Sequence, residues 1–340
     1  MKKVIYGAGE FGKRLFKILK LGGEKIDIFV QTNLNENINI EGIDVISYKD
    51  FIEIEEPYLV YIAINDEKTV ENIKDRFRTD NFDMSKVLNM QSFIKQNYDL
   101  LFEIGDKKCL LCGHSVTRFL PGGEKNDIFL KKNIIGGGYR ENAICPICGS
   151  LDRTRWVYWV LKNFTNLFME ENRVIHFAPE IYLRKQLEEN KDCDYYPVDL
   201  KKMAGGAKVH RVDITSIPFI DNFADYIIVN HVLEHIPDEK TAVSEMKRVL
   251  KEKGKIVMSF PISIEENTFE DNNITTDEQR EKYYGQKDHV RLYGRDFKKH
   301  FESYGFQVDV YSPKDYMELN DIKKYGLLEN DTVLICSKKE

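Results

Sequence analysis

Four of the six cysteines form two short pairs that are suited to binding a metal ion. Cys109 and Cys112 make the first CxxC pair, Cys145 and Cys148 make the second, and a glycine follows each pair. Such a pair makes a tight turn that points both sulfurs inward, and two turns supply the four thiolates of one tetrahedral zinc site. Four sulfurs leave no open position, so we expect a structural zinc ion without His114 as a ligand. A redox-active dithiol is the alternative.

A second set of polar residues stands where predicted strands end. Asp199 follows the apolar residues 195–198, and Asn230 and His231 follow residues 226–229. Short apolar runs of this kind are typical of strands that are buried on both faces of a parallel sheet. Open α/β sheets bind ligands at the carboxyl ends of their strands, where a carboxylate such as Asp199 can accept both ribose hydroxyls. The sequence therefore predicts a nucleoside-binding crevice.

The predicted strand over 226–229 belongs to a strand–helix–strand unit. From Asp238 the apolar residues recur with a helical period on one face. The pattern predicts that the helix ends near Gly254, after a lysine-rich last turn, and that a buried strand follows over 255–260. A further helix is predicted over 150–161, with Ser150 as its cap. Arg153 and Arg155 precede its apolar face and are candidates for contact with an anionic acceptor.

The first residues of the chain contain a glycine-rich turn. A short strand over 4–6 leads into Gly7, Gly9 and Gly12 in the spacing GxGxxG, and a helix follows. This spacing lets a backbone approach a pyrophosphate at a helix amino terminus. The second predicted strand ends without the acid that would hold a ribose, which disfavours NAD. Two interpretations stay open: a nucleotide-binding turn, or a structural or dimerising module whose glycines allow close helix–strand packing.

The run from Asp225 through His231-Val232-Leu233-Glu234-His235-Ile236-Pro237 to Lys255 resembles class I S-adenosylmethionine-dependent methyltransferases. The turn after the first strand of that domain reads His176-Phe177-Ala178-Pro179-Glu180, where most of the family has an acid and two glycines. A zinc-ribbon subgroup resembling methyltransferase type 11 carries this variant, together with a CPxCGSxxR run and a DHVRxYG run, here Asp288 to Gly294. The resemblance implies an α/β doubly wound sheet whose last strand is antiparallel.

The resemblance also implies roles for single residues. Asp199 would hold the cofactor's ribose, Asp213 would accept from its adenine amino group, and the backbone of Ile214 would meet the ring. Further cofactor contacts would come from Ala178, Glu180 and Asn230. If the acceptor needs a general base, His289 is favoured because it lies in the acceptor-facing segment, and His231 is the next candidate; imidazole titrates near neutral pH.

Composition and charge restrict the class of protein. The chain has 340 residues, 42% of them hydrophobic, and a net charge of −6 with acids and bases interspersed. We expect no nucleic-acid partner, since no basic stripe appears, and no membrane span, since no apolar run approaches ~20 residues. The paired cysteines and the absence of a signal-peptide pattern predict a cytoplasmic protein. The sequence leaves two states open, a monomer and a homo-oligomer.

We expect three parts: a Rossmann-like domain over 1–95, a zinc ribbon over 105–150 and a methyltransferase domain over 151–340. The first part resembles domains that precede sugar-modifying acyltransferases and some methyltransferases, which implies a nucleotide-sugar ligand. The predicted function is methyl transfer from S-adenosylmethionine to a small-molecule or sugar- or glycan-linked acceptor, as in polysaccharide biosynthesis. The alternatives are a non-catalytic nucleotide-sugar-binding or assembly protein with a degenerate cofactor site, and an NAD-dependent oxidoreductase.

Overall fold

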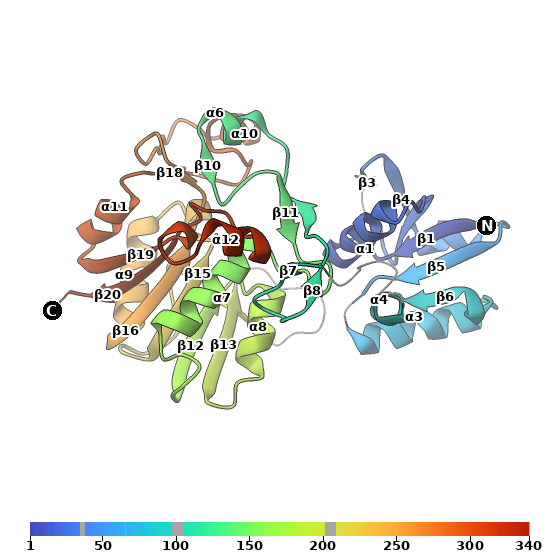
Figure 1. The fold of residues 1–340 in the computed structure, drawn as a ribbon, viewed down its shortest axis with the longest axis horizontal. Coiled ribbons are helices and arrows are strands. Elements are labelled where there is room, and N and C mark those ends of the chain that lie inside the picture. The colour runs from blue at the N-terminus through green and yellow to red at the C-terminus, as the bar shows by residue number, and fades with distance from the viewer. Residues whose placement is uncertain (35–37, 65, 97–104, 201–208, 340) are drawn as a thin grey trace. The chain divides into compact units, whose positions relative to one another are not determined.

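The computed structural model describes residues 1–34, 38–64, 66–96, 105–200 and 209–339, and the chain forms two compact units. The first unit comprises Met1–Gly105 with Val116–Leu120, and the second comprises Asp106–Ser115 and the described residues from Pro121 onward. Each unit is built around a sheet of its own (Figure 1). Both cysteine pairs lie in the second unit.

The first unit contains a six-stranded sheet in the order β3-β4-β2-β1-β5-β6. All neighbouring strands are parallel except β3 and β4. Its strands are β1 (Lys2–Tyr6), β2 (Ile28–Gln31), β3 (Ile38–Ile40), β4 (Ile43–Ser47), β5 (Tyr58–Ile62) and β6 (Val87–Asn89). Its helices are α1 (Glu10–Leu21), α2 (Tyr48–Ile52), α3 (Glu67–Thr79), the 3₁₀ turn η1 (Met84–Lys86) and α4 (Met90–Gln96). The core includes apolar side chains from β1, β5 and α3, and the polar residues of α3 lie between its buried apolar ones in the sequence.

The second unit contains a seven-stranded sheet in the order β14-β13-β12-β15-β16-β20-β19. Its strands are β12 (Asn172–Phe177), β13 (Cys193–Asp199), β14 (His210–Arg211), β15 (Ala224–Asn230), β16 (Leu250–Ser259), β19 (Phe306–Tyr311) and β20 (Val333–Lys338). The strands from β14 to β16 are parallel, whereas β20 is antiparallel to both β16 and β19. The predicted α/β sheet with an antiparallel last strand is therefore confirmed.

Helices lie on both faces of this sheet (Figure 1). They are α7 (Asp152–Phe164), α8 (Ile181–Glu188), α9 (Glu239–Val249), α11 (Phe297–Ser303) and α12 (Leu319–Tyr325), with the 3₁₀ turns η2 (Leu233–His235) and η3 (Pro313–Asp315). One continuous core joins alternate strand residues, such as Ile227 and Met258, to the apolar faces of α9 and α11. The intervening strand residues are buried as well, which explains why the strands read as nearly continuous apolar runs.

Short elements complete the chain around the large sheet. They are β7 (Lys107–Lys108), β8 (Ser115–Val116), β9 (Leu120–Gly122), α6 (Asp127–Lys131), β10 (Ile134–Ile135), β11 (Arg140–Ile144), β17 (Ile262–Ser263), α10 (Asp277–Tyr284) and β18 (Tyr293–Gly294). β17 pairs with both β10 and β18, so the segment after β16 and the segment before α7 share one small sheet. The acidic segment 262–279 begins with the short strand β17.

Two predicted boundaries are wrong. The helix before β16 ends at Val249 rather than near Gly254, and β16 begins at Leu250. Leu250 already pairs with Ala224, and the register then shifts, so Gly254 lies within an irregular start of the strand. A Cβ at Gly254 would lie 2.7 Å from Leu250 and 3.0 Å from the carbonyl oxygen of Asp225, so its glycine serves close packing rather than a helix stop.

Candidate functional site

The strand order of the second unit reverses between β12 and β15. The chain passes from β12 through α8 to β13 on one side of β12, and it later returns to β15 on the other side. A reversal of this kind leaves a crevice outside the carboxyl ends of the two strands, where α/β sheets bind ligands. Phe177 pairs with Val229, so the residues that follow, Ala178 and Asn230, lie at the same edge of the sheet.

A hydrogen-bond network joins the ends of these strands. Glu180 Oε2 lies 2.9 Å from His176 Nε2, and Glu180 Oε1 accepts from Asn230 Nδ2 at 3.2 Å. The Nδ1 of His176 lies 2.9 Å from the hydroxyl of Tyr195, and Ser259 donates to Asn230 Oδ1 at 3.1 Å. His176 is fully buried. The structure therefore brings Glu180 and Asn230 together as predicted, and it fixes the orientation of the Glu180 carboxylate before any ligand binds.

Two residues at this edge have a backbone conformation that glycine adopts more easily. Ala178, directly after β12, has φ +45°, and His231, directly after β15, has φ +53°. Their amides donate to Val198 and Ser259 carbonyl oxygens at 2.9 and 2.8 Å. Left-handed residues with a Cβ cost free energy and concentrate at functional sites. The ends of both central strands are thus held in strained turns.

The two predicted nucleoside-binding carboxylates follow neighbouring strands. Asp199 is the last residue of β13 and pairs with Arg211, and its carbonyl accepts from the amide of Val212 at 3.0 Å. Asp213 lies two residues beyond the end of β14, and its side chain is exposed. The next residue, Ile214, buries its side chain in the core, so only its backbone is available to a ligand.

The carboxylate of Asp213 already has a structural partner. Its Oδ1 accepts from the amide of Thr215 at 2.9 Å and from the Thr215 hydroxyl at 2.7 Å. These bonds lower the pKa of Asp213 below its ordinary value, so it is ionised at neutral pH. The residue therefore stabilises a tight turn, and an adenine contact would use the rest of its carboxylate.

His231 and Glu234 form a buried pair beyond the end of β15. His231 Nδ1 lies 3.3 Å from Glu234 Oε1, although the two atoms lack hydrogen-bond geometry. Burial, together with Arg153, lowers the pKa of His231 well below its ordinary value, while burial raises the pKa of Glu234 to about 8. Both groups are therefore largely uncharged at neutral pH. Perturbed pKa values of this size are concentrated at functional sites.

A group of charged residues, of which the sequence analysis named only Arg153, lies close to His231. Arg140 holds Asp152 through two hydrogen bonds, of 2.6 and 3.0 Å, and Arg153 donates to the carbonyl oxygen of Gly136 at 3.2 Å. Burial and nearby Asp152 raise the pKa of Asp331 to about 7. Arg153 also acts electrostatically on Glu180 and Glu234. Isolated charges in separate segments carry no motif, so only folding reveals this cluster.

The other predicted base, His289, is also buried. It lies in the loop between α10 and β18, and its ring centroid is 4.6 Å from that of His235. Burial lowers the pKa of His289 to about 4. His231 and His289 are close enough to affect each other electrostatically, so the structure places both predicted bases in one region.

The predicted roles of Arg155 and Ser150 are wrong. Arg155 is fully buried and donates to backbone carbonyls of residues 142, 143, 150, 325 and 326, so its guanidinium is a structural clamp. The helix cap is Leu151, without a side-chain hydrogen bond, whereas the hydroxyl of Ser150 lies 3.4 Å from Cys109 Sγ. Arg153, two residues earlier in the chain, does lie close to the charged cluster that contains Arg140 and Asp152.

The four cysteine sulfurs gather in one place. Sγ atoms of Cys109 and Cys148 are 3.8 Å apart, those of Cys112 and Cys145 are 3.9 Å apart, and all four lie within 4.8 Å of one another. Zn–S bonds of about 2.3 Å in a tetrahedron place sulfurs about 3.8 Å apart, so the donor set fits zinc. The glycines after each pair have φ +75° and +76°, which explains why both turns require glycine. His114 does not belong to this group.

The glycine-rich turn of the first unit combines tight packing with open space. A Cβ at Gly12 would lie 1.7 Å from the carbonyl oxygen of Gly7, and one at Gly7 would lie 2.9 Å from that of Ala63. At Gly9, which precedes α1, a Cβ would meet nothing within 4 Å among the described residues. Two of the three glycines are thus required by helix–strand packing, and only Gly9 leaves room for a ligand.

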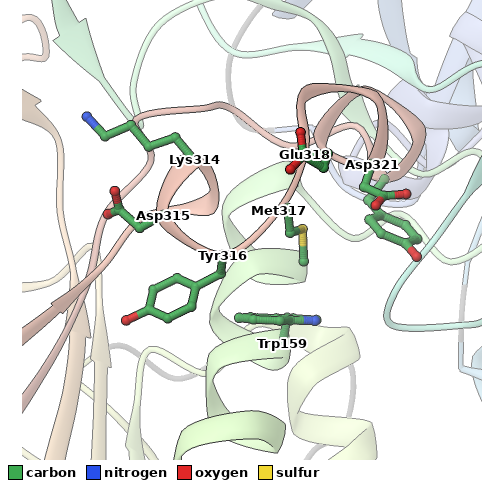
Figure 2. A pocket seen from close by; sticks show the side chains of 8 residues that line it. Trp159, Lys314, Asp315, Tyr316, Met317, Glu318 and Asp321 are labelled. Carbon is green, nitrogen blue, oxygen red and sulfur yellow. The ribbon is translucent and has the colours of Figure 1, made fainter.

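A hollow on the surface of the second unit lies away from the switch point. It has a volume of about 550 Å³ and is lined by α7 and the segment from η3 to α12, including Trp159, Tyr316 and Met317 (Figure 2). Trp159 and Tyr316 have ring centroids 6.0 Å apart and belong to an aromatic cluster. None of the predicted cofactor residues lines this hollow. We therefore place the candidate site at the switch point, on geometry, rather than in this hollow.

None of the described helices is long and apolar enough to cross a membrane.

Residues 182–258 match the family model of a methyltransferase domain. The match begins in α8 and ends in β16, so it contains β13, β14 and β15 and the polar residues that follow them. Among curated proteins, the chain is similar to the uncharacterized protein MJ1123 of Methanocaldococcus jannaschii, with 27% identity over 124 residues. That alignment covers 36% of this chain and 58% of the relative, which is less than two thirds of its length.

Solved structures of methyltransferases are also similar to the chain. One is an S-adenosylmethionine-dependent methyltransferase from Archaeoglobus fulgidus, with 17% identity, 55% of this chain and 94% of that chain covered, and a TM-score of 0.36. Another is the 1,6-didemethyltoxoflavin-N1-methyltransferase of Burkholderia thailandensis bound to 1,6-didemethyltoxoflavin and S-adenosylhomocysteine, with 13% identity, coverage of 56% and 79%, and a TM-score of 0.37. With TM-scores below 0.5, these two likenesses do not identify a ligand of this chain. Residues 182–258 carry the sequence pattern of a methyltransferase domain.

Proposed function

We propose that the second unit transfers a methyl group from S-adenosylmethionine. The observation that carries this proposal is that the matched segment and the switch point lie in the same part of the fold. The segment that matches a methyltransferase domain, 182–258, supplies the carboxyl ends of β13 and β15, the strands on either side of β12, next to the crevice where this class of sheet binds its ligand. When bound, the cofactor supplies an electrophilic methyl group, and the protein contributes mainly by positioning the two reactants.

The residues at the switch point fit this cofactor. Ala178 stands where most of these enzymes have their first glycine, and its φ of +45° keeps a glycine-like turn. Glu180 presents a fixed carboxylate to an ammonium group, because Asn230 and His176 hold both its oxygens. Asp199 ends β13 beside Arg211, and Asp213 follows β14, so the two carboxylates would meet the ribose and the adenine of one nucleoside.

We propose His231 ahead of His289 as the proton acceptor for an acceptor hydroxyl. His231 directly follows Asn230 at the switch point, whereas His289 lies in the loop between α10 and β18. Burial lowers the pKa of both imidazoles, so their position and not their basicity separates them. The proposed acceptor is a small molecule or a sugar- or glycan-linked molecule, which rests on analogy with the predicted role of the first unit.

Titration calorimetry with S-adenosylhomocysteine tests the cofactor site. A lost charge-assisted hydrogen bond costs about 1.5–3 kcal/mol, so we expect Asp199→Ala to weaken binding roughly ten- to a hundred-fold. Asp213→Ala should have a smaller effect, since that carboxylate also stabilises its own turn. Asp309→Ala is the matched control, because Asp309 is exposed on β19 at the far edge of the sheet. Absence of wild-type binding at millimolar ligand would contradict the proposal.

The alternative functions predict different ligands. An NAD-dependent oxidoreductase would bind NAD through the first unit and leave S-adenosylhomocysteine unbound. A non-catalytic assembly protein would bind a nucleotide sugar and show no methyl transfer to any acceptor. Parallel titrations with the three ligands on the intact chain separate these functions from the proposed one.

We further propose that Cys109, Cys112, Cys145 and Cys148 hold one structural zinc ion. Four thiolates at tetrahedral spacing give a closed site, whose metal would stabilise the surrounding loops rather than act on a substrate. Elemental analysis should find this ion in the wild type and lose it in Cys148→Ser, while Cys193→Ser, outside the cluster, should keep it. Zinc near zero with four intact thiols in the wild type would exclude the site.

A further inference from the structure

Three potential metal ligands meet beyond the end of β15, away from the cysteines. Glu234 and His235 lie in η2, directly after the end of β15, and His289 comes from the loop between α10 and β18. One nitrogen of each imidazole and one carboxylate oxygen all lie within 4.8 Å of one another. Glu234 and His289 are each 1% exposed, whereas His235 is partly exposed. The fold thus gathers two histidines and a carboxylate from segments that are distant in sequence.

Three buried atoms of this triad have no hydrogen-bond partner among the described residues. Both carboxylate oxygens of Glu234 and the Nδ1 of His289 are buried without a hydrogen-bond partner among the described residues. Leaving such groups unsatisfied is costly, and most buried polar atoms in proteins are paired. His231 comes within 3.3 Å of one Glu234 oxygen but lacks hydrogen-bond geometry, and it offers nothing to His289 Nδ1. A cation among the three residues would satisfy all of these atoms at once.

The surrounding contacts orient the triad in the way that metal ligands are oriented. His235 Nδ1 lies 3.2 Å from the carbonyl oxygen of Asp288 and 3.3 Å from its carboxylate, which leaves Nε2 as the lone-pair nitrogen. The backbone of Tyr284 lies close enough to the His289 ring to act on it, and Nδ1 is a buried ring nitrogen without a hydrogen-bond partner among the described residues. Outer-shell partners of this kind fix the tautomer and the direction of ligating histidines.

The backbone that carries the triad is also held firmly. The amide of Val290 donates to the carbonyl oxygen of Glu234 at 2.8 Å, which ties the two ligand segments together. Arg291, 1% exposed, donates to the carbonyls of residues 233, 236 and 237, and Glu270 accepts from it through both carboxylate oxygens. The site is therefore supported by a buried clamp, as a binding site requires for a defined geometry.

We propose that Glu234, His235 and His289 bind a divalent first-row transition-metal ion. Two imidazoles with one carboxylate are the donor set of open zinc and non-haem iron sites, which keep positions for water or substrate. Metal bonds of about 2.0–2.1 Å place ligand atoms about 3.3 Å apart, so a small rotation of the partly exposed His235 closes the site. The proposal shares no residue with the cysteine cluster and does not depend on methyl transfer.

The test counts ions on the full chain after the cysteine cluster has been filled with zinc. The zinc-loaded protein is titrated with Co²⁺ by calorimetry, and with Mg²⁺ as a hard cation that prefers oxygen ligands. We expect one Co²⁺ per chain to bind and no Mg²⁺. Cobalt-edge X-ray absorption should show nitrogen and oxygen ligands and no sulfur. No second ion, or a cobalt ion bound only by sulfur, would overturn the proposal.

Variants locate the ion. His289→Gln and Glu234→Gln should each weaken Co²⁺ binding by at least about a hundred-fold, because loss of an outer-shell partner alone costs 10–100-fold. His210→Gln, an exposed histidine on β14, should bind as the wild type does. Equal Co²⁺ affinity in the triad variants and the wild type would overturn the site. If both triad variants fail to fold, the cobalt stoichiometry and ligand atoms of the wild type decide the matter.

Discussion

The two units each begin their large sheet with a strand, a turn and a helix, but they build the turn differently. In the first unit, β1 leads through Gly7 and Gly9 into α1, which contains Gly12. A Cβ at Gly9 would enter open space. In the second unit, β12 leads through Ala178 and Glu180 into α8, and the Glu180 side chain is tied to His176 and Asn230. The glycine turn of the first unit can offer a ligand only backbone groups, whereas the turn of the second unit offers the Glu180 side chain, which hydrogen bonds hold in one orientation.

This difference shows what glycine contributes to such a turn. Gly12 is required because α1 packs against the backbone of Gly7, which is independent of any ligand. The turn after β12 manages without glycine because Ala178 accepts a left-handed backbone at some cost. In this turn, the GxGxxG pattern therefore indicates close packing at Gly7 and Gly12. Only Gly9, where a Cβ would enter open space, leaves room for a ligand.

The largest effect is expected from Gly12→Ala. The new Cβ would lie 1.7 Å from a backbone oxygen that cannot move without shifting β1, so the first unit should lose about 3 kcal/mol or more of unfolding free energy. Urea unfolding measures this loss. Gly9→Ala is the matched control and should change stability by less than about 1 kcal/mol, because its Cβ enters open space. Equal effects at the two positions would break the comparison.

A second prediction concerns the charge buried near the turn of the second unit. Asp331 has a pKa of about 7 in the folded chain, against 3.8 ordinarily, so the folded state binds its proton more tightly. The stability that this group contributes is full below about pH 4 and is lost as the pH rises to 7. Asp331→Asn keeps the acceptor for Thr332 and should therefore stabilise the unit by on the order of 2–4 kcal/mol at pH 8.

The measurement for Asp331→Asn is chemical unfolding at pH 4 and pH 8. The variant and the wild type should differ by less than about 1 kcal/mol at pH 4, where the carboxyl group is protonated in the folded state and about half protonated in the unfolded state. Asp309→Asn, at an exposed aspartate on β19, should show no such pH dependence. A gain of the same size at both pH values would mean that burial of the charge is not the cause.

A third prediction asks whether the open space at Gly9 serves a ligand. Gly9→Val fills that space without meeting the protein, so it should weaken binding of a uridine diphosphate sugar at least tenfold while leaving S-adenosylhomocysteine affinity unchanged. Calorimetry on the intact chain gives both affinities, with NAD as a second probe. If the wild type binds neither probe, the glycines serve packing alone.

The smallest effect is expected from Ala178→Gly. Glycine adopts a φ of +45° without strain, so the second unit should gain stability or lose none, within about 1 kcal/mol. Ala224→Gly, at a fully buried position in β15, is the control and should destabilise. A loss at Ala178 as large as the loss at Ala224 would show that the turn after β12 is unstrained, and the two turns would then differ less than the structure indicates.

The sequence by itself determined the strands and the positions of their polar ends. Apolar runs over β12, β13 and β15 are long enough to be buried on both faces, and each is followed directly by a polar residue such as Asp199 or Asn230. The paired cysteines also determined their own cluster, because each knuckle is a local turn that needs only its glycine. Local patterns of this kind depend on neighbours in sequence, which is why they can be read without the fold.

Only the tertiary structure decided which side chains face one another. Arg140, Asp152 and Asp331 come from separate segments without a motif, yet they share one buried cluster with Arg153. No sequence pattern indicated that the guanidinium of Arg155 would donate its hydrogen bonds to backbone carbonyls. The meeting of Glu234 and His235 with His289 likewise depends on two loops held together by Arg291. Such contacts arise from long-range packing and burial, and no local periodicity encodes them.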